Sequence, residues 1–437
     1  MQYHISNWNH WEKRCADALR GNLPDPEVLT KLKFRYTCPA KKDGIYLPRW
    51  KWDSDFHAAT YRHFDPEMAW EELQGLFVHQ VAEGPDAGML PHMAYFSEND
   101  DVNSQNLFRH PHRSILTQPA LTAIVALAVH QKLPRPDILK AIYPKLAAYH
   151  DWFDRRRDPD NDRLAAIIHP WESGWDASQR WDQMLGITKD TPNPMELLLH
   201  KRVELVGTLF EHHCDAESLM HAEDGFYVEP ADFNAIRAAD LDALAEIARE
   251  IGKEQEEIDA FRTRAEGIRQ AIQEKMITVN GENRLHVHDL VGADEQKNSP
   301  DSASKFVLLF GQCVNQEQAE LLRGELNGNG SFFNTPYRIA TMPTDNRLFD
   351  GREYWRGNVW LPINWLIFTG LRRYRFFKEA EELAKNSLDL VERSGFCEFF
   401  NPINGKRGQK FQKPCPQNQS WSTIVLDMLA ECKESLG

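Results

Sequence analysis

Two acidic side chains in unusual surroundings are the first candidates for chemistry in this sequence. In residues 171–181, WESGWDASQRW, Glu172 and Asp176 lie four positions apart with Gly174 between them, so the chain can bend tightly and bring a carboxylate against a tryptophan. An aromatic, partly desolvated wall raises the pKa of a carboxyl group, which a general acid needs near neutral pH. The alternative is that Asp176 caps a helix beginning near Ala177, because Asp is a preferred N-cap residue.

A second carboxylate must face the first across a bond that is to be broken. The best candidate is Glu398, which precedes two aromatic residues and a turn at residues 401–405, NPING. A glutamate just before such a turn is expected to be rigid and exposed, unlike one on the surface of a helix. A surface glutamate without a role is the plain alternative.

Tryptophan is the most informative residue type here. Many of the 13 tryptophans stand beside acids or arginines in segments that are not periodic, at 50–53, 171–176 and 355–357. A carbohydrate site needs flat aromatic faces for the apolar side of the sugar and short charged or amide groups for its hydroxyls. Packing in the core explains any single tryptophan, but several such segments together indicate a sugar site.

The elements that would position these residues are mostly helices. Apolar residues recur at three- and four-residue steps, and alternating segments are few, so we expect an all-α fold. Helices are predicted at 66–81, with Asp65 as N-cap and Pro66 at the first position, and also at 114–131, 136–153, 231–251, 254–277, 316–326, 359–374, 376–391 and 419–432.

The predicted connections are long, and long ordered loops in a helical chain usually carry function. They cover 41–57, 83–112, 161–195, 332–358 and 396–420. Residues 293–304 and 324–330 are the two candidate hinges. Because no segment resembles a linker, we interpret both as surface excursions of one domain that spans residues 1–437.

Composition excludes several classes of protein. With 24 glycines, 24 prolines and 42% hydrophobic residues in 437, the chain is globular, and its formal net charge of −14 argues against nucleic-acid or anionic-membrane partners. Seven cysteines without a C-x-x-C pair indicate reduced thiols, and neither a signal peptide nor a membrane helix is visible. We therefore expect a cytoplasmic protein, either a monomer or a homo-oligomer.

Metal and cofactor sites are not expected. His212 and His213 are adjacent and would point apart, so they cannot easily share an ion. The loop histidines His110 and His112, with His92 and Glu98 nearby, are better placed but are more simply polar loop residues. Phosphate-cradling glycine loops, dinucleotide patterns and G-x-S-x-G elbows are missing from the sequence.

Six motifs in order resemble glycoside hydrolase family 63 and its clan relatives, the α-glycosidases with an (α/α)6 barrel. The matching segments are WDSDFH at 52–57, FVHQ at 77–80 with GMLPH at 88–92, ESGWDAS at 172–178, DFN at 232–234, YWRGNVW at 354–360 with Asn364, and Glu398 with Asn401, Pro402, Gly405 and SWS at 420–422. The resemblance implies six helical hairpins in two concentric rings, with long functional loops gathered at the active-site end.

The resemblance also implies roles for individual residues. Asp176 is the general acid and Glu398 the general base of a mechanism that inverts the anomeric centre, with two carboxyl groups about 6.5–9.5 Å apart. Sugar-binding positions are Trp52, Asp53, Phe56, Gln80, His92, Trp175, Arg180, Trp355, Arg356, Gly357, Trp360 and Trp421. Arg356 either holds a carboxylate or braces its loop, since buried Asp and Arg are usually paired.

Two departures from the family pattern are visible. Residues 405–420 form a basic stretch with two prolines where relatives run more directly into the SWS motif, so this loop is expected to shape the far side of the pocket. The chain lacks the large β-sandwich that eukaryotic members place before the barrel. It therefore resembles the short bacterial type. Some of those act on mannosylglycerate or glucosylglycerate, and Tyr354, Tyr95 and Gln118 are then candidates to meet the glycerate carboxylate.

The hypothesis is an exo-acting, inverting α-glycosidase that hydrolyses a short α-glucoside or α-mannoside, a disaccharide or a glycosylglycerate. One alternative is a sugar isomerase or epimerase on the same architecture, in which His57, His92 or His112 moves the proton. A sugar-binding protein without catalysis is the third possibility.

Overall fold

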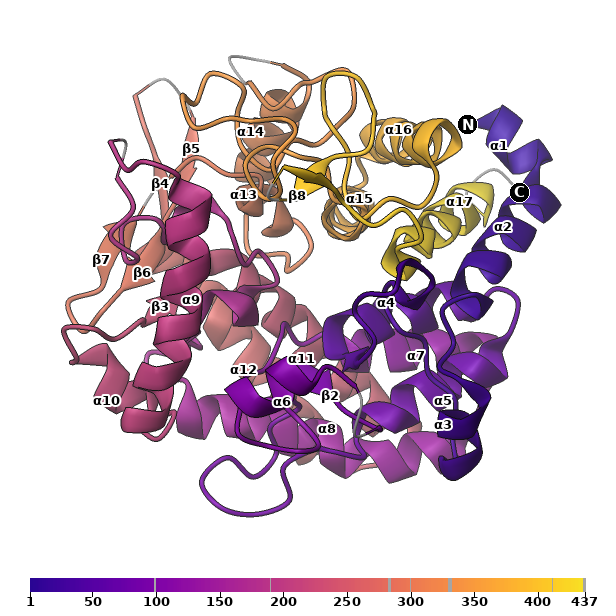
Figure 1. Ribbon diagram of the computed structural model, residues 1–437, viewed down its shortest axis with the longest axis horizontal. Helices are drawn as coiled ribbons and strands as arrows, with labels where there is room; N and C mark the ends of the chain where they lie inside the picture. Colours follow the sequence, from indigo (N-terminus) through magenta and orange to yellow (C-terminus); the bar gives the residue numbers. More distant parts are fainter. Residues whose placement is uncertain are drawn as a thin grey trace.

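The computed structural model describes residues 1–97, 100–188, 190–281, 284–298, 300–328, 332–410 and 412–434. In this part of the chain six segments contact one another in a closed ring around the middle of the molecule (Figure 1). In ring order they are α4 (Lys51–Tyr61), α7 (Thr122–Lys132), α11 (Ala231–Glu250), α13 (Ser304–Val307), α15 (Leu361–Arg373) and the 3-10 helix η5 (Ser420–Ile424), which continues into α17 (Val425–Glu434).

A second layer of helices covers this ring from outside. Helices α5 (Pro66–Leu76), α8 (Pro136–Arg156), α12 (Gln255–Ala271) and α16 (Phe377–Ser394) pack on α4, α7, α11 and α15 respectively, each following its partner along the chain. Helix α14 (Gln316–Leu326) follows α13. The N-terminal α2 (Trp8–Arg20) packs on η5 and α17 and so joins the two ends of the chain. The predicted barrel of helical hairpins is confirmed.

Local signals in the sequence explain where several of these helices begin. The Asp65 carboxylate accepts the backbone N–H of Met68 and Pro66 is the first residue of α5, as predicted. Asn315 and Gln318 form a reciprocal capping box at the start of α14. Such caps satisfy backbone donors that have no partner inside the helix.

Several helices were not predicted, and for α4 its complete burial explains why. The supposed loop 41–57 contains the first part of α4, in which every residue from Lys51 to Tyr61 is buried. A helix surrounded by protein shows no apolar stripe, so its periodicity is invisible. Helices α2 and α9 (Pro194–Glu211) were also missed, and the helix expected at 114–131 begins only at Thr122. Further short helices are α1 (Gln2–Ser6), α3 (Pro26–Lys31), α6 (Val102–Leu107) and α10 (Ala216–Met220).

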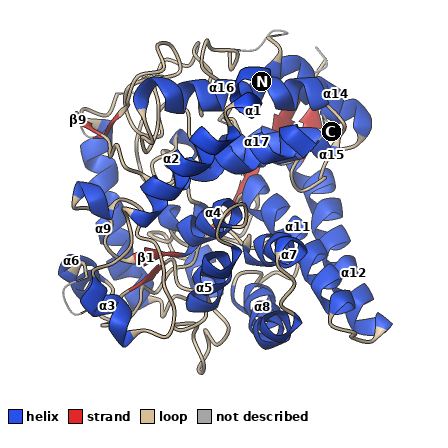
Figure 2. Ribbon diagram, turned by 90° about the vertical axis from the view of Figure 1, so that its right-hand side faces the viewer, coloured by secondary structure: helices blue, strands red, loops and turns tan. Residues whose placement is uncertain are grey.

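Short antiparallel strands occur only in the connections of the described chain. The pairs are β1 (Arg49–Trp50) with β2 (Met93–Ala94), β4 (Ile277–Val279) with β5 (Leu285–Val287), and β8 (Gln409–Lys410) with β9 (Lys413–Pro414), while β6 (Asp289–Val291) lies between β3 (Val228–Glu229) and β7 (Gln296–Asn298). Figure 2 shows β1, β9, α6, α9 and many long loops on one side of the molecule, with α12 on the opposite side. The predicted loop-rich end is present.

None of the helices in the described ranges combines the length and the hydropathy needed to cross a bilayer.

The carboxylate of Asp427 joins the last helix of the ring to two of its neighbours. It pairs with Arg62 at 2.6 Å and His63 at 2.7 Å, just beyond α4, and accepts the indole N–H of Trp365 in α15 at 2.8 Å. Burial alone would raise the pKa of Asp427, but the charge of Arg62 and the hydrogen bonds from His63 and Trp365 outweigh it and hold the pKa well below its ordinary value. The ionised carboxylate therefore stabilises the closed ring.

We predict that Asp427→Asn lowers the free energy of unfolding by about 3 kcal/mol, because it leaves the partners of a buried charge uncompensated. Urea unfolding at pH 7 measures this. Asp17→Asn, which breaks the exposed pair of Asp17 with Lys13, is the control and should cost less than about 0.5 kcal/mol. Because the pKa is depressed in the folded state, the difference between wild type and Asp427→Asn should persist at pH 5 and narrow only below about pH 4. Equal losses in the two variants would contradict this role.

Candidate active site

Both predicted acids line one pocket on the loop-rich side. The pocket encloses about 1000 Å³, including its open mouth. Its walls are built by Pro39, Tyr46, Trp50, Asp53, His92, Met93, Asp101, Ser104, Phe108, Gln118, Trp171, Gly174, Asp176, Leu199, Arg202, Tyr354, Glu398, Lys410, Gln419 and Trp421. The lining therefore draws on nearly the whole length of the chain.

Asp176 lies in a turn between two short 3-10 helices, Pro170–Ser173 and Gln179–Trp181. Gly174 ends the first in the left-handed conformation, φ 78°, which gives the tight bend expected of this segment. Ser178 caps the second by accepting the backbone N–H of Arg180. The alternative that Asp176 is itself a helix cap is therefore wrong.

The Asp176 carboxylate is fixed by three donors from distant segments. Tyr354 donates its hydroxyl at 2.9–3.0 Å, and the indole N–H of Trp355 donates at 2.8 Å. Arg202 of α9 forms a short ion pair with the same carboxylate, and it also donates to the Asp176 backbone carbonyl at 3.1 Å. These contacts hold the carboxyl group at the pocket wall.

Glu398 is more deeply buried than Asp176 and makes fewer hydrogen bonds, so the exposed carboxylate expected from its turn is wrong. Its Oε1 accepts the hydroxyl of Tyr46 at 3.1 Å and lies 4.0 Å from the Lys410 ammonium. Its Oε2 has no hydrogen-bond partner among the described residues. Burial raises the pKa of Glu398, the charge of Lys410 and the hydrogen bond from Tyr46 oppose this shift, and the negative charge of Asp176 adds to it. A free oxygen on a buried carboxylate suits a group that receives a proton from bound water.

Four lining residues carry buried polar atoms that have no partner within the described ranges. They are the indole nitrogen of Trp50, Nε of Arg202, Oε2 of Glu398 and the side-chain oxygen of Gln419. An unsatisfied buried polar atom costs about 1–3 kcal/mol, so such atoms in a pocket wall are expected to meet a polar ligand. Donors and acceptors beside tryptophan faces match the requirements of a sugar.

Several other predicted sugar-binding residues also line the pocket. Asp53 accepts the Gln419 amide at 3.4 Å, and burial followed by the charge of Glu398 raises its pKa well above the ordinary value. Gln118 uses its side-chain oxygen to accept the backbone N–H of Trp52 at 2.9 Å. The indole of Trp421 donates to the backbone carbonyl of Glu398 at 3.3 Å.

The remaining predicted aromatics lie behind the pocket wall. Trp355 stacks on Trp360 with ring centres 3.7 Å apart and an interplanar angle of 2°, and Trp175 packs against Trp355 at 5.2 Å. The Trp52 ring packs directly against the backbone of Gly174. The Phe56 ring packs edge-on against the Trp52 ring, with ring centres 5.2 Å apart. These rings do not line the pocket, and they support the residues that do.

The direct sugar contacts expected of two arginines are not what the structure shows. Arg180 is buried and held by Asp232 at 2.6 Å and Asp289 at 2.8 Å. Arg356 forms a two-pronged pair with Asp182 at 2.6 and 2.7 Å. Neither guanidinium lines the pocket, because a buried arginine needs a carboxylate partner and each has found one inside the protein. Arg356 therefore braces its loop.

Gln80, Tyr95 and Gly357 also lie outside the pocket lining. The Gln80 amide donates to the backbone carbonyls of Gly88 and Lys145, each at 2.8 Å, and so ties two connections together. Tyr95 is buried in a separate apolar cluster with Met93 and Phe108. Gly357 has φ 133°, and a Cβ there would meet the ring of Phe349 at 2.5 Å, so it serves the backbone path of its loop.

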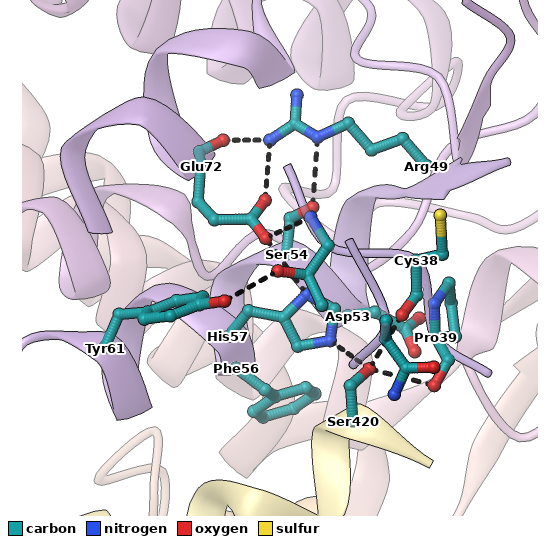
Figure 3. A network of polar contacts seen from close by, with 12 residues as sticks. Cys38, Pro39, Arg49, Asp53, Ser54, Phe56, His57, Tyr61, Glu72 and Ser420 are labelled. Atoms are coloured by element: carbon teal, nitrogen blue, oxygen red, sulfur yellow. Dashed lines mark hydrogen bonds and ion pairs between the residues drawn. The ribbon is translucent and has the colours of Figure 1, made fainter. Parts of the chain in front are cut away.

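The histidines of the isomerase alternative are not assembled in one place. His57 is fully buried between Ser420, 2.6 Å from its Nε2, and Glu72, 3.3 Å from its Nδ1 (Figure 3). His112 is exposed, and only His92 of the three lines the pocket. Burial lowers the pKa of His92 to about 3, so its ring is neutral at physiological pH. The network in Figure 3 holds α4, α5 and η5 together beneath the site.

Ten lining residues were not singled out from the sequence: Pro39, Tyr46, Met93, Asp101, Ser104, Phe108, Leu199, Arg202, Lys410 and Gln419. Tyr46, Leu199, Arg202 and Lys410 come from segments whose contact with the acids depends on the fold. For Lys410 a signal existed, because it belongs to the basic stretch 405–420 that was expected to shape the far side of the pocket. For Arg202 none did, since α9 itself was not predicted.

The described residues contain one group that could hold a metal ion, and it lies away from the pocket lining. Oxygen atoms of Asp158, Asp160 and Asp162 all lie within 4.8 Å of one another, and Lys275 pairs with Asp162 at 2.7 Å. The adjacent histidines considered in the sequence are not part of this group. Glu98, named there as a further possible ligand, lies outside the described residues.

Comparison with known proteins gives a consistent result. Residues 46–422 match the family model described as the mannosylglycerate hydrolase MGH1-like glycoside hydrolase domain. The chain is 31% identical over 400 residues to the mannosylglycerate hydrolase of Thermus thermophilus, covering 85% of this chain and 92% of that protein. It is 25% identical over 427 residues to the glucosylglycerate hydrolase of Mycolicibacterium hassiacum, covering 88% and 92% respectively.

A solved structure is similar over almost the full length. The crystal structure of the family 63 mannosylglycerate hydrolase from Thermus thermophilus, in complex with Tris and D-glycerate, matches with a TM-score of 0.80 and 26% identity. The match covers 96% of this chain and 100% of that one.

We predict that Gly174→Ala displaces the Trp52 ring and with it the turn that carries Asp176. An added Cβ would lie 3.1–3.3 Å from three ring atoms of Trp52. Gly186→Ala is the matched control, because Gly186 has a similar φ of 67° but nothing within 4 Å of an added Cβ.

Both variants should lose about 1–2 kcal/mol from backbone strain in urea unfolding, and crystal structures should show movement of Trp52 only in Gly174→Ala. An unmoved Trp52 ring in that variant would contradict the close packing described here.

Proposed function

The chain belongs to the mannosylglycerate hydrolase MGH1-like family of glycoside hydrolases, within glycoside hydrolase family 63, and from this premise we propose that it is an inverting α-glycosidase acting on a glycosylglycerate. The observation that carries the proposal is the placement of Asp176 and Glu398 in the wall of one pocket, with their side chains linked through two tyrosines and a lysine.

In the proposed mechanism Asp176 protonates the glycosidic oxygen and Glu398 removes a proton from the attacking water. The contacts Asp176 to Tyr354, Tyr354 to Lys410 and Lys410 to Glu398 measure 2.9, 3.1 and 4.0 Å. Because consecutive contacts share an atom, Asp176 Oδ2 and Glu398 Oε1 are at most about 10 Å apart, a limit compatible with the spacing of about 6.5–9.5 Å in inverting enzymes. The free Oε2 of Glu398 supports its assignment as the base.

Two cationic side chains in the pocket wall support an anionic aglycone. Arg202 and Lys410 both line it, on the side where Tyr354 meets Asp176. Because Gln118 uses its oxygen to bind the Trp52 backbone, its NH2 end is the one that can meet a ligand. Amide, tyrosine and cationic donors around one acid suit the carboxylate of glycerate, the aglycone named for the relatives.

We also propose that residues 1–437 act as one catalytic domain. The pocket takes its lining from positions between Pro39 and Trp421, and α2 packs against η5 and α17. A division of the chain would leave either part with an incomplete site.

The activity is tested by a hydrolysis screen over mannosylglycerate, glucosylglycerate, trehalose, nigerose and kojibiose, with the product anomer followed by proton NMR. We expect a glycosylglycerate to be hydrolysed fastest and the sugar to appear first as the β-anomer. Release of the α-anomer first would reject inversion. Interconversion of free sugars without any hydrolysis would favour the isomerase alternative.

We predict that Asp176→Asn lowers the rate on a glycosylglycerate by about 10²–10⁴-fold, because the leaving oxygen loses its proton donor. A glycosyl fluoride, whose leaving group needs little protonation, should lose much less. Asp224→Asn, which changes an exposed acid outside the pocket lining, should keep the wild-type rate on both substrates. Equal losses on the glycoside and the fluoride would reject Asp176 as the general acid.

A further inference from the structure

Lys410 occupies the junction between the two acids. It lies in β8, within the basic loop 405–420. Its ammonium donates to the hydroxyl oxygens of Tyr46 and Tyr354, and lies over the two rings at 5.1 and 4.3 Å. It also approaches Glu398 Oε1 at 4.0 Å. The side chain is three-quarters buried, so solvent screens this charge only in part.

The chemistry of an ammonium group fixes the direction of these hydrogen bonds. An ammonium has donors and no acceptor, so each tyrosine oxygen must accept from Lys410. Burial, together with the neighbouring carboxylates, raises the pKa of both tyrosines well above the ordinary value, so each hydroxyl keeps its proton. That proton is then directed to the acid on the other side, from Tyr46 to Glu398 and from Tyr354 to Asp176.

We propose that Lys410 is a positioning residue of this site, whose ammonium orients the hydroxyls of Tyr46 and Tyr354 toward the two acids and supplies the positive charge beside Glu398. The assignment of Glu398 as a base rests on the proposed function. The orientation of the two tyrosines and the charge beside Glu398 follow from the geometry alone.

The other charged and titratable groups around Glu398 are mostly acidic or neutral. Besides Lys410, those that interact with it are Tyr46, Asp53, Asp176, Tyr354 and Cys415. Lys410 is thus the cation of this group, and its charge opposes the effects of burial and of Asp176 on the pKa of Glu398. Removing it should make Glu398 harder to ionise.

The first test compares pH profiles of kcat/KM for wild type, Lys410→Met and Lys410→Arg on the hydrolysed glycoside. A general base must be deprotonated, so a higher pKa moves the acidic limb to higher pH. We expect this limb to move up by about one pH unit in Lys410→Met, as for loss of an opposite charge at this distance, and to return toward wild type in Lys410→Arg.

Lys413→Met is the matched control. Lys413 is exposed and stands opposite Lys410 in the pairing of β8 with β9, so this variant removes the same charge from the same loop outside the pocket lining. Its acidic limb should coincide with that of wild type. A limb that stays in place in Lys410→Met while the rate falls equally at every pH would overturn the proposal. A rise in KM for anionic glycosides without any movement of the acidic limb would also overturn it, since Lys410 would then only bind the substrate.

A second measurement does not depend on turnover. Infrared difference spectra of wild type against Glu398→Gln isolate the carboxyl band of Glu398, and its change with pH gives the pKa of this group. The difference between Lys410→Met and the double variant Lys410→Met/Glu398→Gln gives the same pKa in the protein without Lys410. We expect the carboxyl to titrate at higher pH in that background, and an unchanged titration would overturn the proposal. If the shift is seen but no glycoside is hydrolysed, the proposed function fails while the role of Lys410 stands.

Discussion

The site depends on the fixation of one carboxylate by groups from distant parts of the chain. Asp176 lies in a short turn that has no regular secondary structure to hold it, and Arg202, Tyr354 and Trp355 supply the donors that do. Those donors come from α9 and from the connection before α15. Because a hydrogen bond weakens steeply away from its ideal geometry, these elements must meet accurately, and the closed ring of helices provides that accuracy.

The pocket wall is stiffened from behind by residues that do not enter the pocket. The stacked rings of Trp355 and Trp360 and the buried pairs of Arg180 and Arg356 with aspartates surround the turn of Asp176. Buried ion pairs contribute little net stability, but removing one partner is costly, so such pairs fix the position of the loops that carry them. The lining residues can therefore leave polar atoms free for a ligand, while the guanidinium groups behind them are paired with carboxylates.

The two acids differ in their surroundings. Asp176 is enclosed by donors, whereas Glu398 is buried with one oxygen free and a single cation, Lys410, beside it. Two carboxyl groups in one pocket can take different roles when their environments give them different pKa values. Burial has the largest effect on the pKa of Glu398, and the charge of Lys410 in the 405–420 loop opposes it. The loop thus supplies a positive charge beside the more deeply buried acid.

The sequence by itself determined the helical class, the resemblance to a barrel family, the choice of Asp176 and Glu398 as candidate acids, and the presence of long loops. These features could be recognised because periodicity, caps and short motifs are local signals. It could not place α4, since a helix buried on all sides shows no apolar stripe. Nor could it separate Gln118 and Trp421, which line the pocket, from Gln80 and Arg180, which bind the protein itself. That distinction was decided by tertiary structure, because whether a polar side chain meets a ligand depends on which partners the fold brings within hydrogen-bond distance.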